Sequence, residues 1–110
     1  MIDWKRVKDL RDEIGEDDFL EVVALFLEET DEVVAQLEAD PNIASMESRL
    51  HFLKGSALNI GLAELAELCQ VNEKAAALGN AASVDIDPVI VSYRSSKAAL
   101  LQSLGQSKAA

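Results

Sequence analysis

The sequence predicts an all-α fold, an antiparallel up-down-up-down four-helix bundle with a short additional helix at the N-terminus. Three observations support this prediction. Apolar residues recur at intervals of three and four along most of the 110 residues, which is the period of an amphipathic helix. No segment shows the strict alternation of apolar and polar residues that indicates a strand. Most of the five glycines and two prolines separate the periodic segments.

The first two predicted helices span about residues 3–14 and 17–39. Gly15 follows the first helix as a C-terminal glycine, and Asp17 or Asp18 is the expected cap of the second. Acidic residues at the start of the second helix complement its dipole. The apolar stripes consist of Val7, Leu10 and Ile14 in the first helix and of Phe19, Val23, Phe26, Val33 and Leu37 in the second.

The third predicted helix, about residues 41–60, has the clearest pattern. Asp40 is the expected N-cap, with Pro41 at the first helical position and Gly61 beyond the C-terminal end. Six apolar residues follow one another at spacings of three and four: Ile43, Met46, Leu50, Leu53, Ala57 and Ile60.

The last two predicted helices span about residues 62–79 and 87–104, and Asp87 with Pro88 forms the expected start of the second of these. Their inward positions are Leu65, Cys69, Asn72 and Ala76 in the fourth helix and Val89, Tyr93, Leu100 and Leu104 in the fifth. Because the connections are short, we expect residues 1–110 to form a single domain. Four helices can close their own core, so we expect a monomer.

The charge of the chain argues against two classes of partner. It has 20 acidic residues and 10 lysines and arginines, a formal net charge of −10. Residues 1–40 contain 14 acidic and 4 basic residues, whereas residues 41–110 contain 6 of each. A nucleic-acid binder or a protein that docks on anionic lipid needs a surplus of basic residues, so we expect neither kind of partner.

The chain has a single cysteine, Cys69, and a single histidine, His51. These numbers leave no intrachain disulfide and no cluster of thiolates or imidazoles for zinc, so we expect no metal and no bound cofactor. The N-terminal residues are charged from the start, and no uncharged run is long enough to span a membrane. We therefore expect a cytoplasmic protein.

His51 is the candidate reactive residue. It lies about 130° from the centre of the apolar stripe of the third helix, so it faces outward or into a groove. Lys54 and Gly55 follow at i+3 and i+4 on the same side. A glycine inside a helix costs ~1 kcal/mol relative to alanine, so Gly55 needs a reason, and one is space for another protein's active site. A neutral imidazole is a nucleophile, and a nearby lysine suits a phosphoryl group.

The stretch from His51 to Gly61, HFLKGSALNIG, resembles the signature of histidine-containing phosphotransfer (HPt) domains. The similarity continues into the fourth predicted helix, and the five-helix plan of these domains covers almost the whole chain. The residues that match are His51, Leu53, Lys54, Gly55, Ser56, Ala57 and Gly61, followed by Leu62, Leu65, Leu68 and Cys69.

The resemblance implies a role for each motif residue. His51 would accept a phosphoryl group, on Nε2, from the aspartyl phosphate of a receiver domain and pass it reversibly to an aspartate of another response regulator. Lys54 would orient and neutralise the phosphoryl group, Gly55 would keep the site open, and Gly61 would turn the chain. A hybrid histidine kinase would stand upstream. The receiver would bring Mg²⁺, so this chain would be a phosphoryl carrier without ATP-dependent kinase activity.

Counting along the helices suggests a partner for the imidazole. His51 lies ten residues before Gly61 and Glu73 twelve after it, an axial mismatch of about 3 Å if the two helices are antiparallel. In the HPt family a glutamine or glutamate at this place often bonds the other ring nitrogen, which would fix the Nδ1–H tautomer and improve Nε2 as a nucleophile. Gln70 and Asn72 are alternatives, and so is a solvated Glu73.

Docking and function leave further alternatives. Leu58 lies on the His51 side of its helix and is a candidate for an apolar docking patch, to which part of residues 17–39 could contribute. Lys54 and Arg49 are expected near the site in the electrically neutral part of the chain. Two other functions stay open at this point. One is the phosphoacceptor domain of a chemotaxis-type histidine kinase, and the other is a non-catalytic helical adaptor.

Overall fold

The computed structural model describes residues 2–40 and 42–109, and its side-chain description covers these ranges apart from Ile43, Ala81 and 105–109. The described chain is helical and contains no strand, so the prediction of an all-α fold is confirmed. Its elements are α1 (Trp4–Ile14), α2 (Glu16–Ala39), α3 (Ile43–Ile60), α4 (Ala63–Ala77), a short 3-10 helix η1 (Ala81–Ser83) and α5 (Asp87–Ala109).

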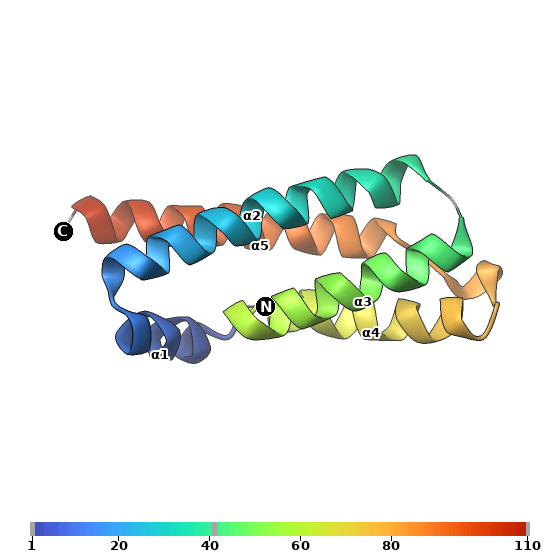
Figure 1. The fold of residues 1–110 in the computed structure, drawn as a ribbon, viewed down its shortest axis with the longest axis horizontal. Helices are drawn as coiled ribbons and strands as arrows, with labels where there is room; N and C mark the ends of the chain where they lie inside the picture. Colours follow the sequence, from blue (N-terminus) through green and yellow to red (C-terminus); the bar gives the residue numbers. More distant parts are fainter. Residues whose placement is uncertain (1, 41, 110) are drawn as a thin grey trace.

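The four long helices lie along the longest dimension of a molecule that measures 47 × 22 × 19 Å (Figure 1). The most extensive packing is between α3 and α4. On either side of this pair, α2 packs against α3 and α5 packs against α4. The short helix α1 lies at one end, where it contacts α2 and α3. The histidine-bearing helix α3 is therefore held between α2 and α4.

The apolar stripes of the helices meet in one core. Five of the six stripe residues predicted for α3 are buried, and the side chain of the sixth, Ile43, lies outside the described residues. On α2 the inward positions include Val34 rather than Val33, which is only partly buried. The polar residue Thr30 completes this stripe at 1% exposure, because its hydroxyl lies 2.6 Å from the carbonyl oxygen of Phe26. Burial of polar Thr30 was not predicted, since the stripe of this helix was identified from its apolar residues alone.

Two of the predicted helix caps are wrong. The N-cap of α3 is Asn42, whose side chain accepts hydrogen bonds from the backbone N–H groups of Ala44 (3.0 Å) and Ser45 (3.4 Å). Asp40 instead accepts a hydrogen bond from the backbone of Asn42, and Pro41 lies outside the described residues. Helix α2 begins at Glu16, so Asp17 and Asp18 lie within its first turn, where they still complement the dipole.

Gly61 makes the turn between α3 and α4. Its φ of +100° is in the left-handed region, and its N–H and that of Leu62 both donate to the carbonyl oxygen of Ala57, at 2.9 and 2.8 Å. The start of the chain is attached at the same point, because the Asp3 N–H donates to the Gly61 carbonyl at 2.6 Å. A Cβ on Gly61 would lie 2.9 Å from the Asp3 carbonyl oxygen. Glycine is thus required here for both conformation and space.

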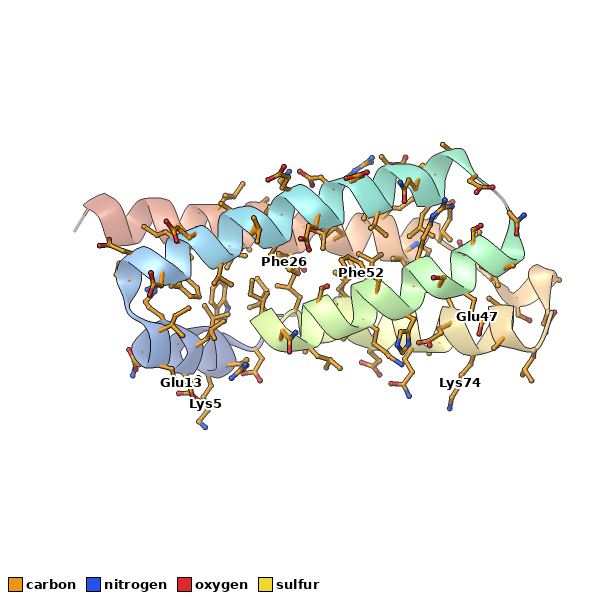
Figure 2. All side chains as sticks on the ribbon, viewed as in Figure 1. Lys5, Glu13, Phe26, Glu47, Phe52 and Lys74 are labelled. Carbon is orange, nitrogen blue, oxygen red and sulfur yellow. The ribbon has the colours of Figure 1, made fainter. Side chains whose placement is uncertain are left out.

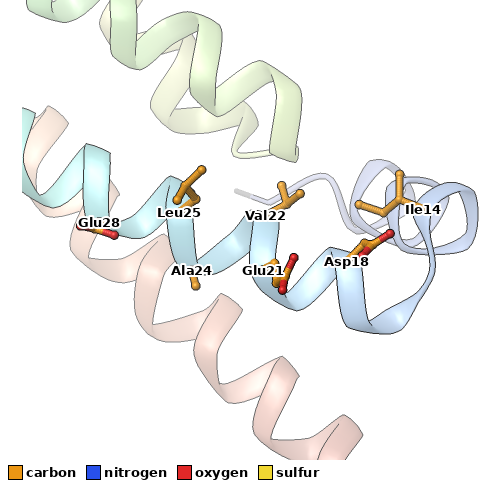
Figure 3. A pocket seen from close by; sticks show the side chains of 7 residues that line it. All are labelled: Ile14, Asp18, Glu21, Val22, Ala24, Leu25 and Glu28. Atoms are coloured by element: carbon orange, nitrogen blue, oxygen red, sulfur yellow. The ribbon is translucent and has the colours of Figure 1, made fainter.

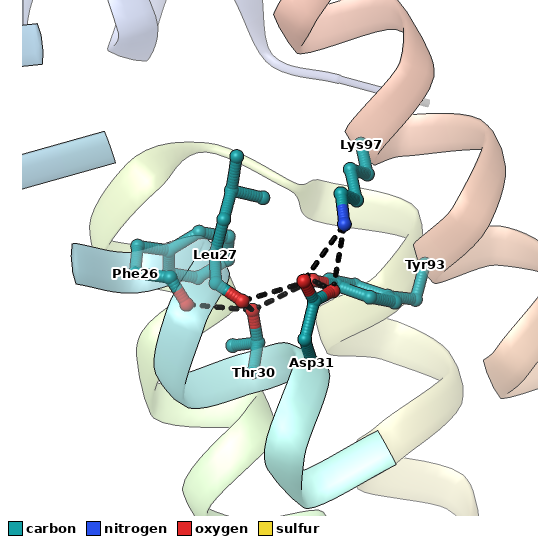
Figure 4. Close-up of polar contacts among 6 residues, drawn as sticks. All are labelled: Phe26, Leu27, Thr30, Asp31, Tyr93 and Lys97. Atoms are coloured by element: carbon teal, nitrogen blue, oxygen red, sulfur yellow. Dashed lines mark hydrogen bonds and ion pairs between the residues drawn. The ribbon is translucent and has the colours of Figure 1, made fainter. Parts of the chain in front are cut away.

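A polar cluster joins α2 to α5 (Figure 4). The carboxylate of Asp31 accepts hydrogen bonds from Tyr93 Oη at 2.5 Å and from Lys97 Nζ at 2.7 Å, and Thr30 Oγ1 lies 2.9 Å from Tyr93 Oη. Burial raises the pKa of Asp31, but the hydrogen bonds from Lys97 and Tyr93 outweigh it and hold the pKa below its usual value. The carboxylate therefore stays charged at neutral pH and ties α5 to α2.

Gly61 and Gly79 allow the two demands on Gly61 to be separated. Both have positive φ, +100° and +71°, but a Cβ on Gly79 would meet no described heavy atom within 4 Å. We expect Gly79→Ala to lower the free energy of unfolding by about 1 kcal/mol through backbone strain alone. Gly61→Ala should lower it by about 1 kcal/mol more, because its methyl group also meets the Asp3 carbonyl. Urea denaturation measures both losses, and equal losses would contradict this account of the turn.

Candidate functional site

His51 lies in the middle of α3 on its solvent side. Leu50 and Leu53 are fully buried and mark the inner face of α3. His51 lies on the outer face, and 70% of its side chain is exposed. One edge of the ring faces α4, where Nδ1 lies 2.7 Å from Oε1 of Glu73. Nε2 is on the far side of the same ring and so points away from α4. The imidazole is thus held at one nitrogen and presented at the other.

Glu73 reaches His51 because α4 returns along α3 after the turn at Gly61. The register derived from the ten residues before this glycine and the twelve after it brings the two side chains to the same level. Only 18% of the Glu73 side chain is exposed, since it lies between the two helices. The carboxylate is therefore part of the packed α3–α4 surface and not a freely moving surface group.

Lys54 binds the same carboxylate. Its Nζ lies 2.8 Å from Oε2 of Glu73, and its side chain is 24% exposed. The two oxygens of Glu73 thus contact two residues of α3, one turn apart. The sequence placed Lys54 beside His51 but did not predict this ion pair. The sequence feature that indicates it is the i, i+3 spacing of His51 and Lys54, which directs both side chains toward the same residue of α4.

The electrostatics of this group keep the carboxylate ionised. The ammonium of Lys54 is the largest influence and lowers the pKa of Glu73, burial partly opposes it, and the contact with His51 lowers it again. An ionised carboxylate can only accept a hydrogen bond, so Nδ1 of His51 must carry the proton. In the neutral ring the lone pair then resides on Nε2, the exposed nitrogen. The arrangement is suited to a nucleophilic imidazole.

Gly55 leaves the surface beside His51 open. It lies one turn after His51 on the exposed side of α3, and a Cβ at this position would meet no described heavy atom within 4 Å. The glycine is therefore not needed for internal packing, and its φ is not in the left-handed region. Because glycine has no side chain, it leaves open space next to the imidazole, through which a partner could approach.

The two alternative partners of the imidazole, Asn72 and Gln70, and the expected neighbour Arg49 do not take those positions in the structure. Asn72 is buried and turned elsewhere, donating to the Leu68 carbonyl at 3.0 Å and accepting from the Asp85 N–H at 2.8 Å. Gln70 is exposed on α4, and Glu73 takes the position at the ring. The prediction that Arg49 lies near His51 is wrong. Its guanidinium pairs with Asp40 at 3.0 Å, because it faces the end of α2.

Cys69 lies under this site as a packing residue. It is fully buried, and burial, together with the charge of Glu73, raises the pKa of its thiol to about 12. The thiol is therefore protonated at neutral pH and is a weak nucleophile. Among the described residues, no group of three or more histidine, cysteine, aspartate or glutamate side chains is arranged to hold a metal ion. No helix of the described chain is long and apolar enough to cross a membrane.

A groove runs beside the site, which we call the N-terminal groove. It is formed by α1, α2 and α3, and residues lining it include Leu10, Val22, Leu25, Ser56 and Asn59. Leu25 is 60% exposed and Val22 is 41% exposed, although both are large and apolar. They point to the same side of α2, in a neighbouring hollow bounded by Asp18, Glu21 and Glu28 (Figure 3). The groove is thus mostly apolar, with Arg6 and Glu29 as the charged residues of its lining, and the hollow beside it is acidic.

Two more apolar residues of α3 are exposed near His51. Phe52, the next residue, is 39% exposed and is seen between the ribbons of α2 and α3 in Figure 2. Leu58 is 59% exposed and lies two turns after His51 on the same helix side. The surface around the imidazole therefore combines apolar side chains with the gap at Gly55. Phe52 was not predicted as an exposed residue from the sequence, since its position alone does not separate it from the core.

Replacing Gly55 tests whether the gap serves folding. Because the added methyl group meets nothing and alanine is a better helix former, Gly55→Ala should raise the free energy of unfolding by about 1 kcal/mol. Urea denaturation of the variant beside the unmodified protein measures this. Ala44→Gly, at an exposed position in the first turn of the same helix, is the reverse control and should lower it. A loss of stability in Gly55→Ala would show that the glycine is structurally required.

Comparison with known proteins gives one match. A protein-family model described as "Hpt domain" matches residues 21–110. The matched range contains α3 and α4 with His51, Lys54, Gly55 and Glu73, whereas α1 precedes it. No curated protein and no solved structure shows a significant match to the chain.

Proposed function

Because the chain belongs to the Hpt domain family, which acts in histidine phosphotransfer in phosphorelays, we propose that His51 accepts a phosphoryl group on Nε2 from a receiver domain and returns it to a receiver aspartate. The contact between His51 Nδ1 and Glu73, at 2.7 Å, is the observation that supports this most directly. This contact keeps the proton of the neutral ring on Nδ1 and so leaves the lone pair on the exposed nitrogen, Nε2.

The transfer step follows from this arrangement. The Nε2 lone pair attacks the phosphorus of the receiver's aspartyl phosphate, and the bond from phosphorus to the aspartate oxygen breaks, so that the aspartate leaves as a carboxylate. The ring then holds the phosphoryl group on Nε2 and a proton on Nδ1, and carries a positive charge that Glu73 stabilises. In the reverse step an aspartate oxygen attacks phosphorus and the Nε2–P bond breaks, which restores the neutral ring.

Lys54 and Gly55 complete the proposed site. The gap at Gly55 admits the active site of the receiver to the imidazole. For Lys54 to orient the phosphoryl group, its Nζ must turn from Glu73 Oε2 to a phosphoryl oxygen, an exchange between two anions that a flexible lysine side chain permits. We place Mg²⁺ on the receiver, so this chain needs no cofactor of its own and acts as a carrier without kinase activity.

We propose the N-terminal groove as the docking surface for the receiver. Hpt domains interact with receiver domains and histidine kinases, and such transient contacts favour a modest apolar surface with a polar rim. Val22 and Leu25 supply the apolar centre of the groove, and the hollow that they share with it adds an acidic edge of Asp18, Glu21 and Glu28. The matching surface of the receiver would therefore be apolar with basic residues at its edge.

The remaining architectural proposals concern the whole chain. We propose that α2, α3, α4 and α5 form an antiparallel up-down-up-down bundle that acts as a single monomeric domain in the cytoplasm, where it would meet its receivers. The hydrogen bonds of Asp31 to Tyr93 and Lys97, which close α2 against α5, support the bundle. So does Figure 1, in which the chain reverses direction from each long helix to the next.

Phosphorylation from labelled receiver domains tests the proposed acceptor. Acid-labile, base-stable label should appear on the protein and be absent from His51→Gln. Glu73→Ala should accept label about 10- to 100-fold more slowly, because it loses the group that orients the ring. Glu67→Ala, an exposed position on the same helix, is the matched control and should keep the unmodified rate. Undiminished label on His51→Gln would remove His51 from the function.

Substitution in the groove tests the docking surface. Leu25→Asp should raise the receiver concentration needed for half-maximal transfer, by about tenfold or more, with little change in the limiting rate, because Leu25 belongs to the proposed docking surface and not to the reacting groups. Val91→Asp on α5 is the control, since Val91 is equally exposed at 63% but does not line the groove. Equal effects of the two substitutions would contradict docking at this surface.

A further inference from the structure

In the unphosphorylated protein, Lys54 is already bound to Glu73. One carboxylate holds both residues, with Oε1 2.7 Å from His51 Nδ1 and Oε2 2.8 Å from Lys54 Nζ. Lys54 and Glu73 are largely covered by protein, at 24% and 18% exposure, while the imidazole is mostly exposed. The charge next to the ring is therefore that of an ion pair and not that of a carboxylate alone.

We propose that Lys54 is a positioning residue that acts through Glu73, keeping the resting His51 imidazole neutral and therefore nucleophilic. This inference rests on the proposed phosphotransfer function and concerns the state of the same site before transfer. It differs from a role in which Lys54 contacts only the transferred phosphoryl group. Under that role, Lys54 would have no effect on the unphosphorylated imidazole.

The physical reason is a conflict in what Glu73 does to the ring. Its oxygen fixes the proton on Nδ1, which leaves the lone pair on Nε2. Its negative charge, however, also favours a second proton on Nε2, and an imidazolium has no lone pair with which to attack phosphorus. The ammonium of Lys54 at the other oxygen cancels most of that charge and leaves Oε1 free to accept from Nδ1. Lys54 thus allows Glu73 to orient the ring without protonating it.

Other charged groups face this site, but they are common to all the variants that test it. On α3, Glu47 lies one turn before His51, and on α4, Lys74 follows Glu73 and points away from the bundle (Figure 2). On α2, the acids Glu29 and Glu32 are exposed, so water and salt screen them. The thiol of Cys69 is uncharged at neutral pH. None of these groups pairs with the carboxylate of Glu73 in the way that Lys54 does.

The experiment compares Lys54→Met with Lys54→Arg between pH 6 and 9. The first measurement is the ring proton NMR signal of His51 in the unphosphorylated protein, whose assignment is unambiguous because the chain has one histidine. The second is the rate of phosphorylation by a phosphorylated receiver, taken at each pH as the ratio of variant to unmodified protein, so that the pH dependence of the receiver cancels. Circular dichroism checks the fold, and Lys54→Gln replaces Lys54→Met if the methionine variant does not fold.

We expect the NMR transition of Lys54→Met to move up by about one pH unit, with Lys54→Arg close to the unmodified protein. The rate ratio of Lys54→Met should be about tenfold lower at the acidic end than at the alkaline end. In Lys54→Met with Glu73→Gln the transition should move back, because the uncompensated carboxylate is gone. An unmoved NMR transition in Lys54→Met, or a rate ratio that is constant with pH, would overturn the proposal.

The two measurements separate this inference from the function on which it rests. The NMR transition needs no partner, so it reports the coupling of Lys54 to His51 even if no receiver labels the protein. Labelling of His51 with an unmoved transition would leave the carrier function standing and remove the proposed role of Lys54. A moved transition without any label on His51 would support the coupling of Lys54 to His51 and remove the carrier function.

Discussion

The geometry of the site depends on the turn at Gly61. Its positive φ ends α3 and sends α4 back along it, and the number of residues on either side sets which side chains meet. His51 and Glu73 are 22 residues apart in sequence, and no local preference brings them together. The same residue anchors the start of the chain through the bond from the Asp3 N–H to the Gly61 carbonyl. Folding and function therefore share one constraint, the space and conformation that only glycine provides here.

The site built on this turn uses few groups, and each has one physical task. Glu73 holds the inner nitrogen of His51, Lys54 neutralises Glu73, and Gly55 leaves the outer nitrogen accessible. The chain needs no deep pocket for this, because the proposed partner supplies the second half of the reaction centre. The large acidic surplus of residues 1–40 lies mainly on α1 and α2, and Asp18, Glu21 and Glu28 line the hollow beside the N-terminal groove. At the imidazole itself, the negative charge of Glu73 is paired with the positive charge of Lys54.

The helices could be predicted because their apolar residues repeat with a clear period, and the counting argument placed Glu73 opposite His51 because the rise per residue is fixed. The errors arose where side-chain choices decide the outcome. Thr30 is buried although polar, because it bonds to its own helix. Asn42 and Asp40 are both good capping residues, and only the backbone path selects between them. The partners of Lys54 and Arg49, long and flexible side chains, depend on rotamers that no sequence period records.

The central claim is that Glu73 occupies Nδ1 of His51 so that chemistry takes place at Nε2. Phosphorus–nitrogen coupling in the NMR spectrum of the phosphorylated, ¹⁵N-labelled protein measures this directly, because it shows which ring nitrogen is bonded to phosphorus. The account predicts coupling to Nε2 of His51, with Nδ1 still protonated. Phosphorus bonded to Nδ1, or to a residue other than His51, would contradict it.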